Sequence, residues 1–349
     1  MRGFLFFAAL NALIPGIVQG AEPEGTEERH EKIDSVVVSS SRAGNNTPVT
    51  YSMVYKDEIQ RFSPINSLPM NLALQPSVVS VNEGGTGLGY SKMTVRGSKG
   101  SQINVTLNGI TLNDAESQEV FWVNIPSLSN MISSVQLQRG LGTSANGAGA
   151  FGASINMSTA SVGADPFASA DLGIGSYNTF TTSFAAGTGL MDSGLYFNAA
   201  YSRNSTDGYI RNAFADVQSA MAVIGWMNEK NSVRLTWLMG NQRTGITWNG
   251  IEPSVYEVDR RYNPAGEYYD GFGNVHYYDN ETDNYMQHHL QLNYTRSFTD
   301  RLAWSTTFNY TRGDGYYENY KAGKSFSKYM MNDPVIDGVV YDEGDFITK

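Results

Sequence analysis

From about residue 165 onward, apolar and polar residues alternate with a period of two, in segments of about ten residues. In the segment 285–298, one face carries Met286, Leu290, Leu292, Tyr294 and Phe298, and the other carries Gln287, His289, Gln291, Asn293, Thr295 and Ser297. Further segments place one apolar set on a single face each: Leu195, Phe197, Ala199 and Tyr201; Val233, Leu235, Trp237 and Met239; Leu302, Trp304, Phe308 and Tyr310. We therefore predict about seven antiparallel strands, each with one apolar and one small polar face.

Strands of this kind form either a soluble β-sandwich or a membrane barrel. Their length is near the ~9–11 residues that cross a bilayer at a tilt. The aromatic residues that cluster toward strand ends, as in interfacial girdles, are Tyr201, Tyr294, Phe298 and Tyr310. Short links such as 299–300 alternate with long ones, so the pattern favours a barrel.

Residues 47–160 read as a small domain with mixed helices and strands. The pattern predicts short helices at 54–62 and 67–75, with Pro64 and Pro76 after them. It predicts strands at 92–97, 103–112, 132–140 and 152–159. The Asn108-Gly109 pair predicts a hairpin turn within the second of these strands.

The N-terminus predicts export. Arg2 is followed by an apolar stretch from Phe4 to Val18 and then by small residues, which is the pattern of a secretory signal peptide over residues 1–20. The alternative is a buried N-terminal helix, but the acidic segment that follows at once has the composition of a disordered tail.

Composition narrows the class of protein further. The chain has no cysteine, which excludes a small secreted scaffold stapled by disulfides. It has 34 acidic against 24 basic residues and no basic aromatic stripe, which argues against nucleic acid as a partner. Beyond the signal peptide no apolar run reaches ~18 residues, so a membrane-embedded form would use strands.

Three valines stand between the acidic segment and a Ser/Asn-rich stretch, in the sequence Asp34-Ser35-Val36-Val37-Val38. A short run of high β-propensity in such surroundings is an aggregation hazard unless it offers a strand to a partner. The alternative is that the valines form the first strand of the folded domain.

Together these features resemble the TonB-dependent outer-membrane receptors over nearly the whole chain after the signal peptide. The segments that carry the resemblance are "IDSVVVSSSR", "MTVRGSKGSQINVTLNGITLNDAES" and "ISSVQLQRGLGTSANGAGAFGASINMST". The resemblance implies an α+β plug domain followed by antiparallel strands of a transmembrane β-barrel, an incomplete part of a barrel of about 22 strands. The implied limits are 1–20 for the signal peptide, 21–46 for the periplasmic linker with the TonB box, 47–160 for the plug and 161–349 for the barrel strands.

The resemblance also implies roles for particular residues. The TonB box is Asp34, Ser35, Val36, Val37 and Val38, which would pair with a strand of TonB in the periplasm. Arg96, Gly97, Arg139 and Gly140 are expected to make plug–barrel contacts, the arginines with barrel carboxylates. Gln136 and Leu141 depart from the residues common in the family, and "FGASINM" replaces a more usual Gly-Gly-Val version. These departures indicate a subgroup of the family. The ligand of this protein therefore cannot be inferred from the resemblance.

The long link from Thr244 to Asn284 is dense in Tyr, Asp and Gly. Long loops often carry function, so we predict that some of its side chains stack on or hydrogen-bond a large ligand. The candidates are Trp248, Tyr256, Arg260, Arg261, Tyr268 and Tyr269. The alternative is an ordinary surface loop of a barrel.

Catalysis and metal binding are not expected. Asp114, Glu116 and Glu119 lie close in sequence, but no complete active site can be assembled around them. His288 and His289 are adjacent, so on a strand they face opposite sides and cannot hold one metal together. The glycine-rich segment lacks the Lys-Ser/Thr ending of a phosphate-binding loop. We expect no cofactor.

The predicted function is energy-coupled uptake of a large scarce ligand across the outer membrane of a Gram-negative cell. By resemblance, the expected ligand is a ferric siderophore or similar iron complex, with cobalamin, haem and glycan as alternatives. The expected partners are TonB, outer-membrane lipid and an extracellular small molecule. A secreted β-rich binding or adhesion protein is the rival reading. Because only about seven strands are visible, the sequence is expected to be a fragment of a longer receptor.

Overall fold

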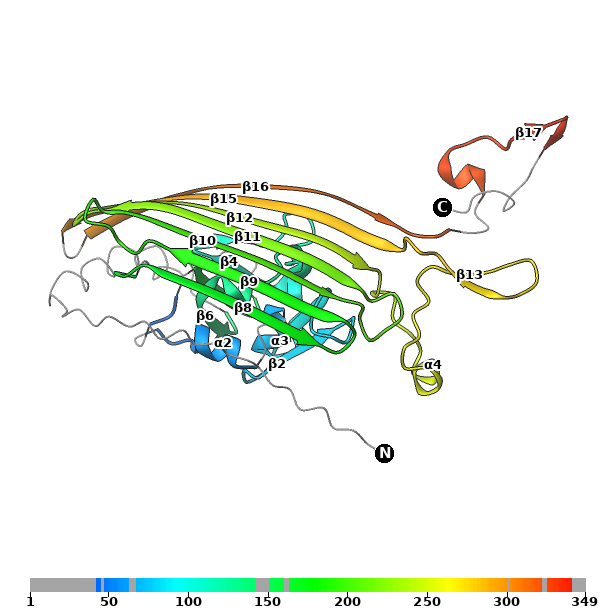
Figure 1. Ribbon diagram of the computed structural model, residues 1–349, viewed down its shortest axis with the longest axis horizontal. Helices are drawn as coiled ribbons and strands as arrows, with labels where there is room; N and C mark the ends of the chain where they lie inside the picture. Colours follow the sequence, from blue (N-terminus) through cyan, green and yellow to red (C-terminus); the bar gives the residue numbers. More distant parts are fainter. Residues whose placement is uncertain are drawn as a thin grey trace.

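The computed structural model describes residues 42–44, 47–62, 67–141, 151–159, 163–299, 302–321 and 325–340. These residues form two parts, a small α+β domain near the N-terminus and a long curved sheet that follows it (Figure 1). We call the first part the plug and the second the barrel sheet.

The barrel sheet has seven strands in the order β16-β15-β12-β11-β10-β9-β8. Its strands are β8 (Phe167–Gly175), β9 (Thr179–Gly187), β10 (Leu195–Thr206), β11 (Ala215–Met227), β12 (Asn231–Gly245), β15 (Thr282–Thr299) and β16 (Leu302–Glu318). Each strand pairs antiparallel with its neighbour. The predicted seven antiparallel strands are therefore confirmed.

Side chains alternate between the two faces of these strands, as the sequence pattern predicted. On β12, Leu235 and Trp237 are exposed on the outer face, while Thr236 and Leu238 are buried on the inner face. The register continues the outer row across the sheet, with Leu235 opposite Leu292 of β15. The outer face therefore carries an apolar band, and the inner face is covered by the plug.

The plug contains two sheets. One sheet has the order β1-β6-β7-β4-β5, with β4 and β7 parallel, and the other is the antiparallel pair of β2 and β3. The strands are β1 (Thr50–Tyr55), β2 (Val78–Asn82), β3 (Ser91–Val95), β4 (Ile103–Leu107), β5 (Ile110–Thr111), β6 (Ile132–Arg139) and β7 (Ala153–Thr159). The helices are α2 (Lys56–Phe62), α3 (Leu68–Leu72) and the short 3-10 turns η1 (Gly100–Gln102), η2 (Trp122–Asn124) and η3 (Leu128–Asn130).

The predicted plug elements are present with shifted ends. Asn108 and Gly109 adopt positive φ values of 53° and 82° in the turn between β4 and β5, as their hairpin propensity predicted. Both helices are shorter than expected. Val54 and Tyr55 were assigned to a helix, but they belong to β1, where they pair with Val135 and Ser134 of β6.

The core of the plug is apolar and fully enclosed. Val135, Leu137 and Ile155 are completely buried, on the adjacent strands β6 and β7. Their burial stabilises the plug because each removes a large apolar side chain from water.

We expect Leu137→Ala to destabilise the plug by about 2–5 kcal/mol, the usual cost of a core cavity. The measurement is urea unfolding of the purified protein, followed by the fluorescence of its tryptophans. Exposed Leu141, which directly follows the same strand, gives a matched control. Equal losses for Leu137→Ala and Leu141→Ala would contradict the assigned core.

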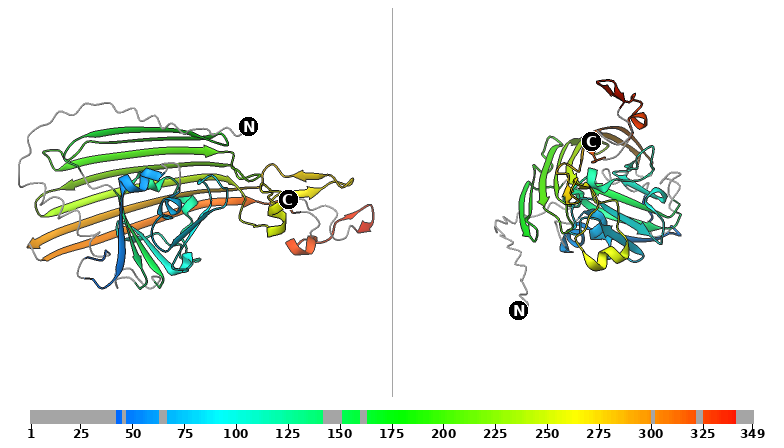
Figure 2. Two further views of the ribbon diagram at one scale, coloured as in Figure 1. Left: turned by 90° about the horizontal axis from the view of Figure 1, so that it is seen from below. Right: turned by 90° about the vertical axis from the view of Figure 1, so that its right-hand side faces the viewer.

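The plug packs against the concave inner face of the barrel sheet, as Figures 1 and 2 show from three sides. The largest apolar cluster contains plug residues such as Trp122 and Leu128 together with Met221 and Leu238 of the barrel sheet. A Cβ atom placed on Gly240 of β12 would lie 2.0 Å from the carbonyl oxygen of Asn124, so the two parts are in direct backbone contact there. The strands thus curve around a mixed α+β plug, an arrangement that differs from the two packed antiparallel sheets of the sandwich alternative.

The remaining elements lie beyond one end of the barrel sheet (Figure 1). They are α4 (Pro253–Val258), β13 (Glu267–Tyr269), β14 (Val275–Tyr277), the 3-10 turn η5 (Phe326–Tyr329), β17 (Val335–Ile336) and β18 (Val339–Val340). The hairpin of β13 and β14 was not predicted, because its strands have only three residues each. Among the described residues, no helix has the length and apolar character needed to span a bilayer.

Candidate functional site

The two ends of the barrel sheet differ in the length of their connections. At one end, residues 188–194, 228–230 and 300–301 connect neighbouring strands. At the other end, residues 176–178, 207–214 and 246–281 connect them, and the last of these is by far the longest. We call these the turn end and the loop end. The asymmetry is the one expected between the periplasmic and the extracellular side of an outer-membrane barrel.

The plug reaches the loop end through its loop between β2 and β3. The backbone N–H of Tyr209 donates to the carbonyl oxygen of Gly84 at 3.2 Å. At the base of this loop, Lys92 of β3 forms an ion pair of 2.7 Å with Glu83. The plug loop and the connection between β10 and β11 are therefore joined at this end.

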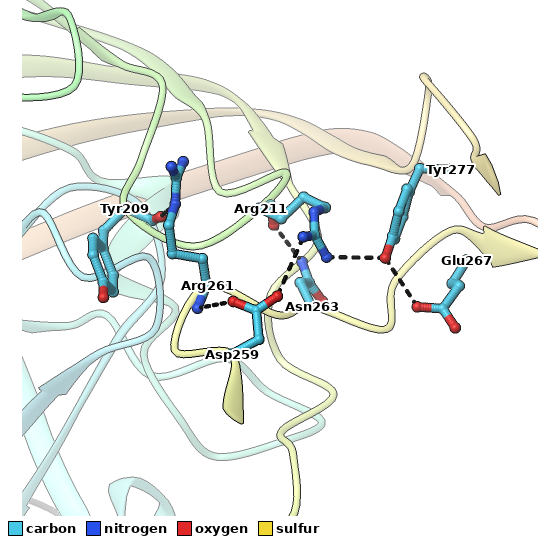
Figure 3. Close-up of polar contacts among 7 residues, drawn as sticks. All are labelled: Tyr209, Arg211, Asp259, Arg261, Asn263, Glu267 and Tyr277. Carbon is cyan, nitrogen blue, oxygen red and sulfur yellow. Dashed lines mark hydrogen bonds and ion pairs between the residues drawn. The ribbon is translucent and has the colours of Figure 1, made fainter. Parts of the chain in front are cut away.

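Arg211 links the two long connections of the loop end (Figure 3). Its guanidinium donates to the hydroxyl of Tyr277 at 2.9 Å and lies 4.8 Å from the centre of the same ring. It also forms an ion pair of 3.3 Å with Asp259. The cation–π contact and the ion pair both use one partly exposed arginine, so this residue fixes the 246–281 connection to its neighbour.

A second set of bonds reinforces the same junction. The backbone N–H of Arg261 donates to Asp259 Oδ1 at 2.9 Å, and its Nε donates to the carbonyl oxygen of Tyr209 at 2.8 Å. Buried Asn263 donates to the carbonyl oxygens of Arg211 and Ile246 at 2.9 and 2.8 Å. These bonds satisfy loop backbone groups and hold the connection in one conformation.

Glu267 gathers three tyrosines on the far side of this network. The hydroxyls of Tyr269 and Tyr277 donate to its two carboxylate oxygens at 3.0 Å each. Burial, together with the hydrogen bond to Glu267, raises the pKa of Tyr262 to about 12. The phenols therefore remain protonated donors at neutral pH.

An aromatic group lies where the plug, β15 and the long connection meet. The ring of Trp248 is perpendicular to those of Tyr90 and Tyr317, with ring centres 5.1 and 6.3 Å apart. Tyr90 belongs to the plug, and its hydroxyl donates to Asp283 on β15. Burial, and then the hydrogen bond to Asp283, raise the pKa of Tyr90. The three aromatic rings offer a surface on which a ligand could stack, and the carboxylate of Asp283 is a hydrogen-bond acceptor beside them.

A second aromatic group lies farther out. Tyr268 stacks on Tyr320 with ring centres 4.5 Å apart and on His276 at 5.3 Å. Tyr268 and His276 belong to the β13–β14 hairpin, and Tyr320 lies in the segment after β16. This second aromatic group therefore joins these two parts of the loop end.

The six predicted ligand residues all lie at the loop end, but the structure does not gather them into one pocket. Trp248 contacts the plug, and Tyr268 belongs to the second aromatic group. Arg260 lies over the ring of Tyr256, and Arg261 is engaged with Tyr209. The remaining candidate, Tyr269, donates to Glu267. Their role in ligand binding stays a prediction.

Sequence reasoning missed residues outside the long connection, namely Tyr90, Arg211, Asp283 and Tyr317. Tyr90 follows the glycine-rich run "GGTGLG", a signal of a tight plug loop that was available. The others are ordinary loop and strand residues, and only the fold brings them together.

The hairpin of β13 and β14 depends on Asp270. Its carboxylate accepts from the Asn274 side chain at 2.9 Å and lies 3.0 Å from His276 Nε2. It also accepts the backbone N–H groups of Phe272 and Asn274. These bonds, the Asn274 side chain first, hold the pKa of Asp270 well below its ordinary value.

We expect the hairpin to loosen in acid, because a carboxylate with a lowered pKa stabilises the folded loop only while it is ionised. Its contribution is complete above the ordinary carboxyl pKa of about 4 and is lost as the pH falls through the lowered value. Amide hydrogen exchange across 270–276, corrected for intrinsic rates, should therefore show more opening at low pH. In Asp270→Asn this pH dependence should disappear; its persistence would contradict the assignment.

Arg96 and Arg139 were expected to reach barrel carboxylates, but their hydrogen bonds within the described residues stay inside the plug. Arg139 donates to the carbonyl oxygen of Pro76 at 2.9 Å and to the hydroxyl of Ser52 at 2.8 Å. Arg96 reaches only the carbonyl oxygen of Arg139, at 3.4 Å. These bonds join the end of β6 to β1 and to the segment before β2, and a barrel contact for either arginine stays a prediction.

The adjoining glycines have conformational roles. Gly97 and Gly140 have φ values of 78° and 94°, a region that favours glycine. Both end a strand directly after an arginine, so they turn the chain at that point. A plug–barrel role for either glycine stays a prediction.

The acidic loop between β5 and η2 has the geometry of a turn. Asp114 accepts the backbone N–H groups of Glu116 and Ser117 at 3.0 and 2.8 Å, bonds that lower its pKa. His288 and His289 face opposite sides of β15, as predicted. In the part of the chain that the structure describes, no group of three or more His, Cys, Asp or Glu side chains is arranged to hold a metal ion. The predicted TonB box, Asp34 to Val38, lies outside the described residues.

A plug on the concave side of an antiparallel barrel sheet is the arrangement found in plugged β-barrels. Residues 43–154 match the family model of the TonB-dependent receptor plug domain. This match identifies residues 43–154 as a TonB-dependent receptor plug domain. The comparison with curated protein sequences gives no match.

Solved structures share the fold. The closed form of the ferric-catecholate import receptor Fiu from E. coli K12 has a TM-score of 0.62 at 15% identity, over 82% of this chain and 40% of Fiu. The unliganded ferric citrate transporter FecA has a TM-score of 0.60 at 16% identity, over 80% of this chain and 41% of FecA. The copper transporter OprC has a TM-score of 0.58 at 17% identity, over 76% of this chain and 37% of OprC. The chain thus spans about two fifths of the length of these structures.

Proposed function

We propose that the protein is an outer-membrane receptor that takes up a large scarce ligand with energy supplied through TonB. The observation that carries the proposal is a TonB-dependent receptor plug seated on the concave face of an antiparallel sheet. A plug in that position closes the lumen, so passage of a ligand requires the plug to rearrange.

The outer face supports placement in an outer membrane. Its apolar band includes Ile224, Leu235, Leu292 and Phe308, which follow one row of the sheet across four strands. Toward the loop end the outer face becomes charged, with the Arg203–Asp216 ion pair. An apolar belt bounded by charge is what a lipid-facing barrel wall presents.

The proposed contact with TonB uses the box Asp34, Ser35, Val36, Val37 and Val38, within a periplasmic linker at 21–46 that follows a signal peptide at 1–20. An added strand obtains its affinity from main-chain hydrogen bonds, so an Asp-Ser-Val-Val-Val segment suffices. Pulling on a linker just before the plug would act on the plug directly.

We propose that the ligand is a ferric siderophore or a similar iron complex and that it binds at the loop end. Fiu and FecA act on iron complexes according to their descriptions, and OprC is described as a copper transporter. The aromatic group of Tyr90, Trp248 and Tyr317 is the best-supported contact, because it joins the plug to two barrel segments.

We expect Trp248→Ala to weaken ligand binding by about tenfold, since loss of one aromatic contact is worth about 1.4 kcal/mol. The measurement is binding of ⁵⁵Fe ferric citrate and of a ⁵⁵Fe ferric catecholate to outer membranes. Phe272→Ala is the matched control, because Phe272 lies in the same connection and is 94% exposed. An equal effect of both changes would contradict the assigned contact.

The experiment that tests the proposed function is uptake of the same two ⁵⁵Fe complexes by cells that express the full-length protein, with and without functional TonB. Uptake that needs both proteins supports the proposal. No TonB-dependent uptake of either iron complex would overturn the assignment to iron; copper, cobalamin, haem and glycans would then be tested in turn.

A further inference from the structure

Across β11, β12 and β15 the inner wall of the barrel sheet changes from apolar to polar, while β10, on the other side of β11, also carries buried Ser202 and Asn204. The register of β11, β12 and β15 places Met221, Leu238 and His289 in one row and Val223, Thr236 and Gln291 in the next. In each row the side chains become more polar from β11 to β15. Across β16 the rows continue as Thr311 and Asn309.

The apolar side is continuous with the core of the plug. The barrel residues in the same buried cluster as the plug core are Tyr196, Met221, Val223, Met227 and Leu238. They come from β10, β11 and the adjacent side of β12. Two unpartnered buried hydroxyls, Ser202 and Ser219, lie one row toward the loop end from Met221, and beyond them Leu88 of the plug packs on Ala215 and Val217. Separating the plug here would expose apolar surface to water.

The polar side contains buried groups that the described protein leaves unpartnered. They are Thr236 Oγ1, His289 Nε2, Gln291 Nε2 and Asn293 Oδ1. All four side chains are more than nine-tenths buried. Buried polar groups in folded proteins are normally hydrogen-bonded, to protein or to water, so this side of the interface is suited to water.

Direct bonds between the plug and β15 are few. Within the described residues, two side-chain hydrogen bonds join them: Tyr90 to Asp283 at the loop end, and Asn108 to Gln291 at a long 3.4 Å. On the other side, Asn204 of β10 donates to Ser127 of the plug at 2.7 Å, so the two sides do not differ in the number of such bonds but in the apolar area between plug and wall. When polar surfaces separate, their hydrogen bonds are replaced by bonds to water at little net free-energy cost. When apolar surfaces separate, no such replacement is made.

We propose that during transport the plug parts from β15 and keeps its contact with β10 and β11, so that a water-soluble, hydrogen-bonding ligand passes along the polar inner face of β15. Thr236, His289, Gln291 and Asn293 line this path. The inference rests on the proposed transport function and adds the side on which the path opens.

These 349 residues contain no cysteine, so in a full-length protein without further cysteines a single introduced cysteine reports on its own position. Gln291 and Val223 lie in the same row of the sheet, on the two sides of the wall. Gln291→Cys and Val223→Cys therefore lie at the same level along the strands. They differ in whether they face the polar or the apolar part of the wall. Thr236→Cys, between them, is a second variant in case loss of the Asn108 contact disturbs folding.

The experiment labels these variants of the full-length protein in cells with a water-soluble maleimide, with and without ⁵⁵Fe ferric citrate or the ⁵⁵Fe ferric catecholate and functional TonB. We expect the complex and TonB together to increase labelling of Gln291→Cys and Thr236→Cys several-fold and to leave Val223→Cys unchanged. Faster labelling of Val223→Cys, or no change at any of the three positions while uptake proceeds, would overturn the inference.

Uptake measured in the same cells separates this inference from the proposed function. If the wild-type protein takes up neither complex, the proposed iron uptake fails and the inference falls with it. If uptake proceeds but the labelling pattern is reversed, only the position of the path is wrong.

Discussion

Val37→Pro is expected to abolish TonB-driven uptake while leaving ligand binding intact. Proline has no backbone N–H and fixes φ, so it removes a main-chain hydrogen bond from an added strand and hinders pairing on both sides. Binding of ligand at the loop end uses other residues and should not change. The measurements are uptake of the transported ⁵⁵Fe complex by cells and its binding to isolated outer membranes.

A proline elsewhere in the linker provides the control. Thr26→Pro places the same residue before the box, where no pairing is proposed, so uptake should remain near the wild-type level. If Val37→Pro cells still take up the complex, the valines are not the TonB contact. The alternative, in which Val36 to Val38 form a strand of the folded domain, would then be favoured.

Gly240→Val is expected to prevent the plug from seating against the barrel wall. Gly240 is on the inner face of β12, and an added Cβ would lie 2.0 Å from the backbone oxygen of Asn124 and 3.1 Å from Pro126. Neither neighbour can rotate away as the end of a flexible side chain would, so the plug must shift. Overpacking of this kind typically costs ~1–3 kcal/mol, and valine extends beyond the Cβ position.

The measurement for Gly240→Val is sensitivity of the cells to a large antibiotic that an intact outer membrane excludes. A plug that no longer seats leaves the lumen open, so sensitivity should rise at equal receptor abundance. Gly271→Ala is the control, because nothing lies within 4 Å of its added Cβ. Unchanged sensitivity, together with a plug that resists protease as in the wild type, would contradict the assigned contact.

The sequence predicted best those strands of the barrel sheet whose alternation of apolar and polar residues is strict. In β12 the outer Leu235 and Trp237 flank Thr236, so the period is visible directly. In β11 the apolar residues Met221 and Val223 face the plug while Ile224 and Trp226 face outward. Both faces of β11 are therefore apolar in part, and a periodicity argument alone cannot assign them.

Inside the plug, the errors arose where distant parts of the chain decide the structure. Val54 and Tyr55 fit an amphipathic helix locally, yet pairing with β6, about eighty residues later, draws them into β1. Strand β2 was not predicted, although "VVSVN" has strand-forming residues, because Pro76 precedes it and a glycine-rich loop follows. Tertiary pairing outweighs both local signals.

For the candidate site, the sequence pointed to the long connection but not to the contacts that its residues make. Trp248 was predicted to contact ligand, and its neighbours Tyr90 and Tyr317 come from the plug and from β16. Arg211, which fixes the long connection, lies in a different connection from the residues that it binds. Such contacts join residues dozens of positions apart, and no local pattern contains that information.

The most direct test of the central claim is cross-linking of Val37→Cys to TonB in intact cells. These 349 residues contain no other cysteine, so in a full-length protein without further cysteines any disulfide adduct with a cysteine-bearing TonB reports this one position. The account predicts an adduct that increases when a transported ⁵⁵Fe complex is present, from a protein that fractionates with outer membranes. Absence of the adduct from a protein that is folded in the outer membrane would contradict it.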